Sequence, residues 1–134
     1  MHVAVYAGRC LCGAVTFKAK GEPKRIGICH CKLCKRDTGA TGRVFVVYGA
    51  EKVAIAGQTE VYAASDKGRR AHCSVCGSPV FSQDVGSDEL ELFWGLFEER
   101  GDGWRPGYEI WTSRRAAWLP PIDGAQQFER GRTV

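Results

Sequence analysis

The amino-acid sequence predicts one mostly β domain with antiparallel strands. Short runs of β-branched and aromatic residues recur along the chain, and glycine interrupts most of the longer segments in which a helix could form. The length of 134 residues lies within the usual range of one domain. We therefore expect a single domain that spans residues 1–134 and is built from short strands.

The expected strands follow one another closely along the chain. In residues 90–94, the side chains of Leu90, Leu92 and Trp94 should share one face, because side chains alternate along a strand. That face is expected to lie in the core. The expected strands cover residues 14–17, 43–48, 53–55, 60–63, 79–82, 90–94 and 108–111.

Helical structure is expected at two places only, as short turns over residues 32–38 and 96–100. The final segment, residues 120–134, contains two prolines, an Asp-Gly pair and several charges. These residues favour an irregular path over the surface.

The composition excludes disordered and membrane-spanning proteins. Apolar residues make up 44% of the chain and charged residues 25%, which is the balance of a folded protein. No apolar run approaches the roughly 20 residues needed to cross a bilayer. The first residues lack the cationic and apolar regions of a secretory signal, so we expect a cytoplasmic location and no membrane partner.

The formal charge of +4 conceals a gradient along the sequence. Residues 20–43 carry seven lysines and arginines against Glu22 and Asp37, whereas residues 84–109 carry eight acidic residues against Arg100 and Arg105. One end of the fold is therefore expected to attract anions.

All seven cysteines fall into three tight groups. Cysteines that serve only as small core residues need no cysteine neighbours, so this clustering indicates metal binding. An odd number of cysteines also argues against a complete set of disulfides within one chain. The groups are a CxC at Cys10 and Cys12, a CxCxxC at Cys29, Cys31 and Cys34, and a CxxC at Cys73 and Cys76.

The first and third groups are predicted to form one structural zinc site. Two closely spaced cysteines supply half of a tetrahedral site, and two such halves complete it. Gly13 follows Cys12 and Gly77 follows Cys76, and glycine takes the positive φ angle that a tight turn around a metal often needs. The middle group then has three thiolates and no fourth cysteine, which predicts an open, exchangeable and catalytic site.

A rival pairing remains open from spacing alone. Cys31 and Cys34 would join Cys73 and Cys76 as a zinc ribbon, and Cys10, Cys12 and Cys29 would be left over. His30 and His72 each adjoin a cysteine, and we expect them to support the ligands rather than to bind metal. If residues 29–31 are extended, His30 should point away from the metal.

These motifs together resemble the glutathione-dependent formaldehyde-activating (GFA) enzyme family. The segments are GRCLCGAVTF, CHCKLCKRDTGA, HCSVCGSPVF and the closing YEIWTSRRAAWLPPIDGAQQFERG, and they cover nearly the whole chain. His72 departs from the apolar or aromatic residue expected before the last CxxCG. The resemblance implies the Mss-four-like fold of small coiled antiparallel sheets organised around zinc, with the same assignment of structural and exchangeable sites.

The resemblance also implies a carbon–sulfur lyase that joins glutathione to formaldehyde. Three thiolates make bound zinc a weak Lewis acid that favours a soft sulfur ligand, so activation of a thiol suits this site better than activation of water. Lys35, Arg36 and Arg43 lie close in sequence to the open site and are expected to hold the carboxylates of glutathione. The expected partners are thus a thiol such as glutathione and a small aldehyde.

Two other functions remain compatible with the sequence. The first is a non-enzymatic zinc module that binds nucleic acid or a protein through the basic segment, although aromatic residues are not interleaved with its lysines and arginines. The second is a thiol–disulfide switch at the middle cysteines, which requires accessible thiols of low pKa and no metal.

Overall fold

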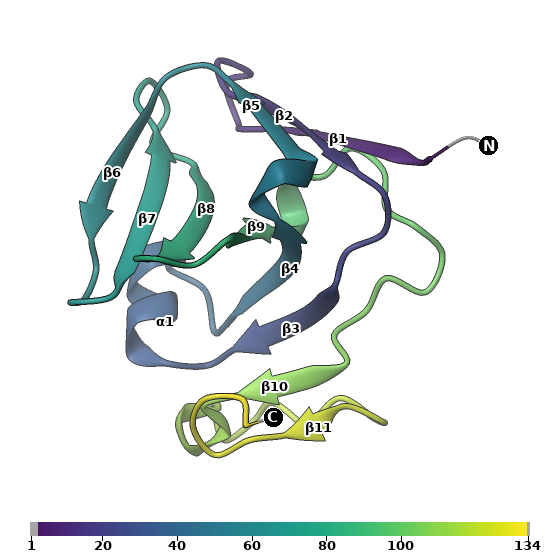
Figure 1. Cartoon of the computed structure of the whole chain (residues 1–134). Helices are drawn as coiled ribbons and strands as arrows, with labels where there is room; N and C mark the ends of the chain where they lie inside the picture. The colour runs from purple at the N-terminus through teal and green to yellow at the C-terminus, as the bar shows by residue number, and fades with distance from the viewer. Residues whose placement is uncertain (1–2, 134) are drawn as a thin grey trace.

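A computed structural model describes residues 3–133 of the chain and shows two β-sheets with one short α-helix (Figure 1). The mostly β fold predicted from the sequence is confirmed. The smaller sheet has the strand order β1-β2-β5, and the larger has the order β11-β10-β3-β4-β9-β8-β7-β6. The strands are β1 (Val5–Arg9), β2 (Thr16–Lys20), β3 (Arg25–Cys29), β4 (Arg43–Gly49), β5 (Val53–Ala56), β6 (Thr59–Ala63), β7 (Gly68–Cys73), β8 (Pro79–Asp84), β9 (Glu89–Phe93), β10 (Tyr108–Ile110) and β11 (Gln126–Gln127).

Most neighbouring strands are antiparallel, as expected, but β10 departs from this rule. It pairs in parallel with β3 on one side and with β11 on the other. The chain after β9 therefore returns along the outer edge of β3, and the closing segment lies beside β10 at that edge of the large sheet (Figure 1). The expected irregular tail contains β11 but otherwise lacks regular structure as far as residue 133, and Val134 lies outside the described residues.

The core lies where β2 of the small sheet packs against β4 and β9 of the large sheet. Phe17, Val46, Tyr48 and Leu92 are all almost fully buried and belong to one cluster. Leu90 and Leu92 are buried as predicted. Trp94 leaves the strand instead and begins the 3-10 turn η2 (Trp94–Leu96), from which it packs against the same cluster.

The helix α1 (Lys32–Thr38) has the bounds that the sequence predicts. Its N-terminus is capped by Cys31, whose sulfur accepts a hydrogen bond from the backbone N–H of Cys34, and its C-terminus is capped by Gly39 at φ 70°. Glycine is the usual residue in this left-handed position. The second expected helical turn, over residues 96–100, was wrong because the 3-10 turn ends at Leu96 and the chain continues irregularly.

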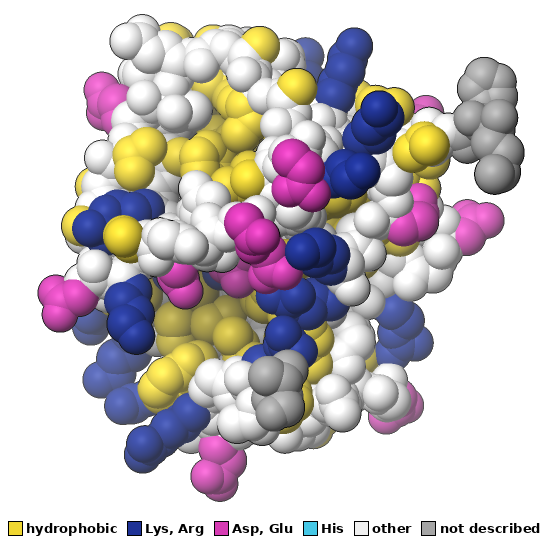
Figure 2. All heavy atoms as spheres, viewed as in Figure 1, with side chains coloured by type: hydrophobic (Ala, Val, Ile, Leu, Met, Phe, Trp, Pro, Cys, Tyr) yellow, Lys and Arg dark blue, Asp and Glu magenta, His cyan; other side chains and the backbone are white. Residues whose placement is uncertain are grey.

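The charge gradient of the sequence becomes a set of ion pairs across the large sheet. Arg25 and Lys24 contact Glu89 at 2.6 and 3.2 Å, and Arg43 contacts Glu91 at 2.7 Å. These basic residues are therefore not free to attract anions. Lysines and arginines do gather at the lower left of the face shown in Figure 2, over and below α1.

Two further 3-10 turns complete the secondary structure. They are η1 (Ala50–Lys52), which joins β4 to β5, and η3 (Thr112–Arg114), which follows β10. Among residues 3–133, no helix has the length and apolar character needed to cross a membrane.

Candidate metal centres

The fold brings Cys10, Cys12, Cys73 and Cys76 together, and we call this group the four-cysteine centre. All four sulfurs lie within 4.8 Å of one another. The Sγ–Sγ distances are 3.7 Å from Cys10 to Cys12 and 3.8 Å from Cys12 to Cys73. A tetrahedral zinc ion with Zn–S bonds of about 2.3 Å places its sulfur ligands about 3.8 Å apart, so the residues fit this metal.

Two similar turns supply these four sulfurs, one between β1 and β2 and one between β7 and β8. In each, the glycine after the second cysteine has a positive φ, 81° at Gly13 and 77° at Gly77. Each glycine donates its N–H to the carbonyl of the first cysteine, Cys10 or Cys73, at 3.1 and 2.9 Å. The turns are therefore closed by the backbone, and glycine serves the purpose predicted for it.

Backbone N–H groups point at the sulfurs of the four-cysteine centre. Val15 donates to Cys10 at 3.3 Å, Ala14 to Cys12 at 3.4 Å and Val75 to Cys73 at 3.4 Å. Hydrogen bonds of this kind offset negative charge on a sulfur atom. Such bonds favour thiolates, which are the form of cysteine that binds a metal.

The second cluster consists of Cys29, Cys31 and Cys34, and we call it the three-cysteine centre. Its sulfurs also lie within 4.8 Å of one another. Cys29 ends β3, Cys31 caps α1 and Cys34 lies in the first turn of α1. The rival zinc ribbon was wrong, because Cys31 and Cys34 meet Cys29 and not the turn that holds Cys73 and Cys76.

The three thiols of this centre differ in access and in acidity. Cys29 and Cys34 are buried, whereas Cys31 is partly exposed. The neighbouring Cys29 and Cys34 thiols lower the pKa of Cys31 to about 2, and the pKa of Cys29 is raised, first by Cys31 and then by Cys34. Neighbouring thiols donate hydrogen bonds to the first thiolate that forms and so lower its pKa. The negative charge of that thiolate then raises the pKa of the next thiol.

A cavity of about 260 Å³ opens beside Cys31, and we call it the Cys31 cavity. Lys32 and Leu33 line it from α1, and Trp111 and Arg114 line it from the segment that follows β10. Trp111 is the one non-glycine residue with positive φ within residues 3–133, at 57°. The only cysteine that lines this cavity is the partly exposed one.

The three cationic residues expected to bind glutathione at the open site do not face the Cys31 cavity. Arg43 is buried and donates to Ser82 and Glu91 at 2.6 and 2.7 Å, so it is not free to bind a substrate carboxylate. Arg36 is exposed on α1, and Lys35 donates to the carbonyl of Arg114. None of the three lines the Cys31 cavity.

The cationic residues that do line the cavity are Lys32 and Arg114. Lys32 follows Cys31 directly, and this adjacency was a usable signal in the sequence. Arg114 and Trp111 gave no signal, because only the parallel pairing of β10 with β3 brings them to the cavity.

Known proteins resemble this chain over the segment that holds both cysteine centres. The family described as glutathione-dependent formaldehyde-activating enzyme matches residues 5–114, which include all seven cysteines. The chain belongs to the GFA family. The resemblance seen in the sequence is thereby confirmed.

A curated relative of the GFA chain is a Schizosaccharomyces pombe protein named an uncharacterized lyase. The two are 29% identical over 76 residues, which cover 57% of this chain and 56% of the relative. The chain thus matches only about half the length of that relative. A crystal structure of a Rhodobacter sphaeroides protein aligns with a TM-score of 0.58 at 20% identity, over 72% of this chain and 91% of that one, and supports the fold alone.

His30, the middle residue of the CHC pattern, links the three-cysteine centre to the neighbouring strand β10. It is fully buried and is not part of the cysteine cluster. Its Nε2 donates to the buried carboxylate of Glu109 at 2.7 Å, and its backbone N–H donates to the carbonyl of Ile110 at 3.1 Å. His30 therefore joins the segment of the three-cysteine centre to β10.

Glu109 also organises the closing segment of the chain. It accepts hydrogen bonds from the backbone of Ile122 and the side chain of Gln127, both at 2.8 Å, and lies 3.5 Å from Arg115. Burial alone would raise the pKa of Glu109. The hydrogen bonds from Ile122, Gln127 and His30 together outweigh burial, so the pKa is lowered overall. The ionised carboxylate is thus the form that the fold stabilises.

We expect Glu109→Gln to lower the free energy of unfolding by about 3 kcal/mol or more. The substitution removes a buried negative charge and leaves the positive charge of Arg115 uncompensated. Urea denaturation of the metal-loaded protein measures this change. Glu98→Gln is the control, because Glu98 is 56% exposed and its contact with Arg9 is 4.0 Å long. Equal stability of the two variants would contradict the role given to Glu109.

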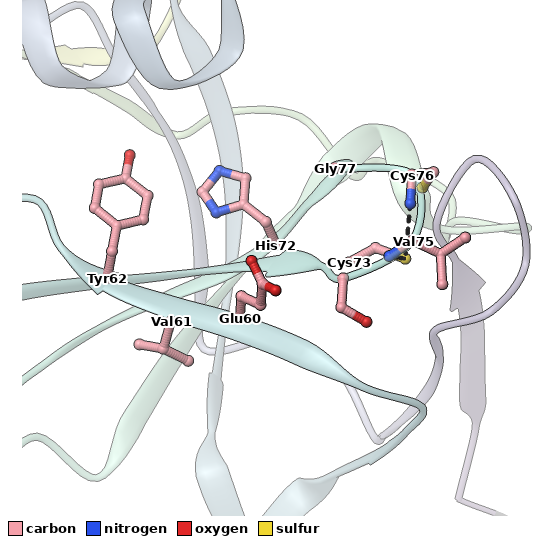
Figure 3. A pocket seen from close by; sticks show the side chains of 9 residues that line it. Glu60, Val61, Tyr62, His72, Cys73, Val75, Cys76 and Gly77 are labelled. Atoms are coloured by element: carbon pink, nitrogen blue, oxygen red, sulfur yellow. Dashed lines mark hydrogen bonds between the residues drawn. The ribbon is translucent and has the colours of Figure 1, made fainter.

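His72, the departure from the family pattern, also binds a carboxylate rather than completing a cysteine cluster. Its Nε2 lies 2.8 Å from Asp37, and its ring stacks on Tyr62 with centroids 5.4 Å apart. Figure 3 shows the two rings on the same side of β6 and β7, with Val61 on the other side. His72 and Tyr62 line a cavity of about 620 Å³. Cys73 and Cys76, at the end of β7 and just after it, line the same cavity.

Proposed function

We propose that this GFA-family chain is a zinc-dependent carbon–sulfur lyase that condenses glutathione, or a similar thiol, with formaldehyde or another small aldehyde. The observation that carries the proposal is the Cys31 cavity, which places two cationic side chains beside the accessible edge of a three-thiolate centre. The four-cysteine centre would hold a structural zinc ion, and the three-cysteine centre an exchangeable one with a free coordination position.

Each part of the centre has a distinct task in this proposal. Cys29, Cys31 and Cys34 would hold the exchangeable zinc, which when bound lowers the pKa of an incoming thiol. Lys32 and Arg114 would hold the carboxylates of glutathione by charge-assisted hydrogen bonds. Leu33 and Trp111 would exclude water from the remaining wall of the cavity.

The proposed reaction is an addition that balances without a redox partner. The substrate sulfur forms a bond with the carbonyl carbon of the aldehyde, and the carbonyl double bond becomes a single bond to a hydroxyl group. The thiol loses one proton, and the former carbonyl oxygen gains one. With glutathione and formaldehyde, the product is S-hydroxymethylglutathione.

Calorimetric titration of the zinc-loaded protein tests this proposal directly. S-methyl glutathione should bind at least about tenfold more weakly than glutathione, because it has the same carboxylates but no ionisable thiol. A neutral thiol of similar size should also bind weakly. If either binds as tightly as glutathione, the site does not recognise this substrate.

The carboxylate contacts are tested by a matched pair of arginine variants. Arg114→Ala should weaken glutathione binding about threefold to tenfold, as removal of a partly exposed charge contact does. Arg36→Ala is the control, because Arg36 is an exposed arginine that does not line the cavity. Equal effects of the two variants would show that the cavity does not position the carboxylates, and added salt should weaken only the contacts that involve charge.

A further inference from the structure

Arg70, from β7, makes a contact with the three-cysteine centre that the cysteine motif does not reveal. Its Nη2 donates to Cys34 Sγ at 3.5 Å. Both residues are buried, Arg70 with 8% of its surface exposed and Cys34 with 1%. Within residues 3–133, Arg70 is the only lysine or arginine with a side-chain hydrogen bond to a cysteine sulfur.

Asp37 holds the other end of the same guanidinium group. Arg70 Nη1 donates to Asp37 Oδ2 at 3.0 Å, while Asp37 Oδ1 lies 2.8 Å from His72 Nε2 and accepts from Tyr62 at 3.1 Å. The side chain of Asp37 is only 2% exposed. Every oxygen of this carboxylate therefore has a partner, and the orientation of Arg70 is fixed.

The arrangement joins the helix of the three-cysteine centre to the strand of the four-cysteine centre. Asp37 lies on α1, one helical turn after Cys34, whereas Arg70 and His72 lie on β7, which ends at Cys73. On β6 and β7, Tyr62 pairs with Arg70 and Glu60 pairs with His72 across the ladder. Tyr62 and His72 consequently present their polar atoms to the same carboxylate of α1.

Charge gives this contact a chemical consequence. Three thiolates and one divalent zinc ion carry a net charge of −1, and a fourth thiolate from a substrate raises it to −2. Burying such charge is unfavourable unless it is compensated. The Arg70 guanidinium donates from Nη2 to the Cys34 sulfur and from Nη1 to Asp37. The cation of the Arg70–Asp37 ion pair therefore lies on the side of the three-cysteine centre.

The geometry points to Arg70 as a positioning residue that tunes the three-cysteine centre through Cys34, with Asp37 fixing its orientation. The inference rests on the proposed binding of zinc at this centre. A charged hydrogen-bond donor offsets part of the negative charge on a ligating thiolate, so both the first three thiolates and a further one meet less repulsion around the ion. Arg70 thus favours a four-thiolate state that the cysteines alone would disfavour.

Zinc affinity, measured by competition with a chromophoric chelator, tests this role without any assay of catalysis. Arg70→Met should weaken zinc binding at the three-cysteine centre about tenfold to a hundredfold, which is the usual effect of losing a partner that supports a ligand. Arg69→Met is the matched control, because Arg69 donates only to the backbone carbonyls of Ser65, Asp66 and Gly68. Zinc kept at the four-cysteine centre reports that the variant is folded.

Two further variants separate charge from geometry. Arg70→Lys keeps the charge but cannot reach Cys34 and Asp37 together, so its zinc affinity should lie between those of the parent and Arg70→Met. Asp37→Asn should shift the affinity in the same direction as Arg70→Met. With cobalt in place of zinc, the sulfur-to-metal charge-transfer band should move in Arg70→Met and stay in place in Arg69→Met.

Unchanged zinc affinity and an unchanged cobalt band in Arg70→Met would overturn the inference. So would a parent protein that holds no zinc at the three-cysteine centre. If Arg70→Met does not fold, Arg70→Lys decides, and parental affinity in that variant also counts against the role. Normal zinc binding with no affinity for glutathione in the parent would instead refute the proposed function and leave the role of Arg70 intact.

Discussion

Cys73→Ser is expected to unfold the domain and to remove the metal of the four-cysteine centre. Cys73 is 3% exposed and packs in one cluster with Cys10, Val15 and Val80. Zinc at a structural site contributes an apparent binding free energy of about 10 to 16 kcal/mol, which rivals the roughly 5 to 15 kcal/mol of stability of a whole small domain. The loss of one ligand should therefore exceed what the rest of the core can offset.

Circular dichroism and zinc content measure this outcome together. The parent should show a cooperative thermal transition, whereas Cys73→Ser should show none and should carry less than one zinc ion per chain. Ser74→Ala, at the next position, is the control and should behave as the parent does. A Cys73→Ser protein that melts like the parent with full zinc content would disprove the structural role of this centre.

Cys31→Ser is expected to fold but to lose the proposed lyase activity completely. The three ligands of this centre come from one short segment, so its metal does not connect distant parts of the chain. Serine also preserves the helix cap, because its hydroxyl can accept the bond that Cys34 now donates to Cys31 Sγ at 3.4 Å. The missing sulfur nevertheless removes the one ligand that borders the cavity.

The comparison that isolates this effect uses three proteins. Cys31→Ser should melt close to the parent protein whose exchangeable metal has been removed by a mild chelator. Cys31→Ala should melt lower, because loss of the cap costs about 1 kcal/mol. Formation of S-hydroxymethylglutathione from glutathione and formaldehyde should fall to the uncatalysed rate in both variants, and retained activity in Cys31→Ser would contradict the assignment of the centre.

The sequence predicted α1 and both cysteine centres because their signals are local. Cys31 caps the helix, Gly39 ends it, and spacing groups the cysteines. The pairing of the first group with the third followed from the matching glycines after Cys12 and Cys76, and the observed turns have the positive φ angles that this argument required.

Four observed strands, β1, β3, β7 and β11, escaped prediction, and in β1 and β3 the reason is that glycine interrupts the apolar pattern. A β-carbon at Gly8 of β1 would lie 2.1 Å from the Phe17 ring, and one at Gly27 of β3 would lie 2.7 Å from the Tyr108 ring. Glycine is required there by aromatic side chains that come from other strands. A sequence pattern cannot distinguish such a glycine from one that breaks a strand.

The walls of the Cys31 cavity also depend on long-range pairing. Cys29 meets Ile110 in the parallel register of β3 with β10, and this register brings Trp111 and Arg114 to the cavity. The same holds for Arg43, which looked free in the sequence. Nothing near it in the sequence reveals that Glu91 will bind it. Cationic residues close to the cysteine motif thus differ in their placement, since Lys32 lines the cavity whereas Arg43 binds Glu91.

The separation of the two halves of the four-cysteine centre determines how the domain must assemble. Cys12 and Cys73 lie 61 positions apart, and closing a loop of this length costs about 4 kcal/mol of chain entropy. Each turn, however, directs backbone N–H groups toward its own sulfurs, so we expect each turn to bind a metal ion before the other turn arrives. We therefore expect refolding to be fastest near one zinc ion per four-cysteine centre, because an excess of metal would load the two turns separately and delay their union.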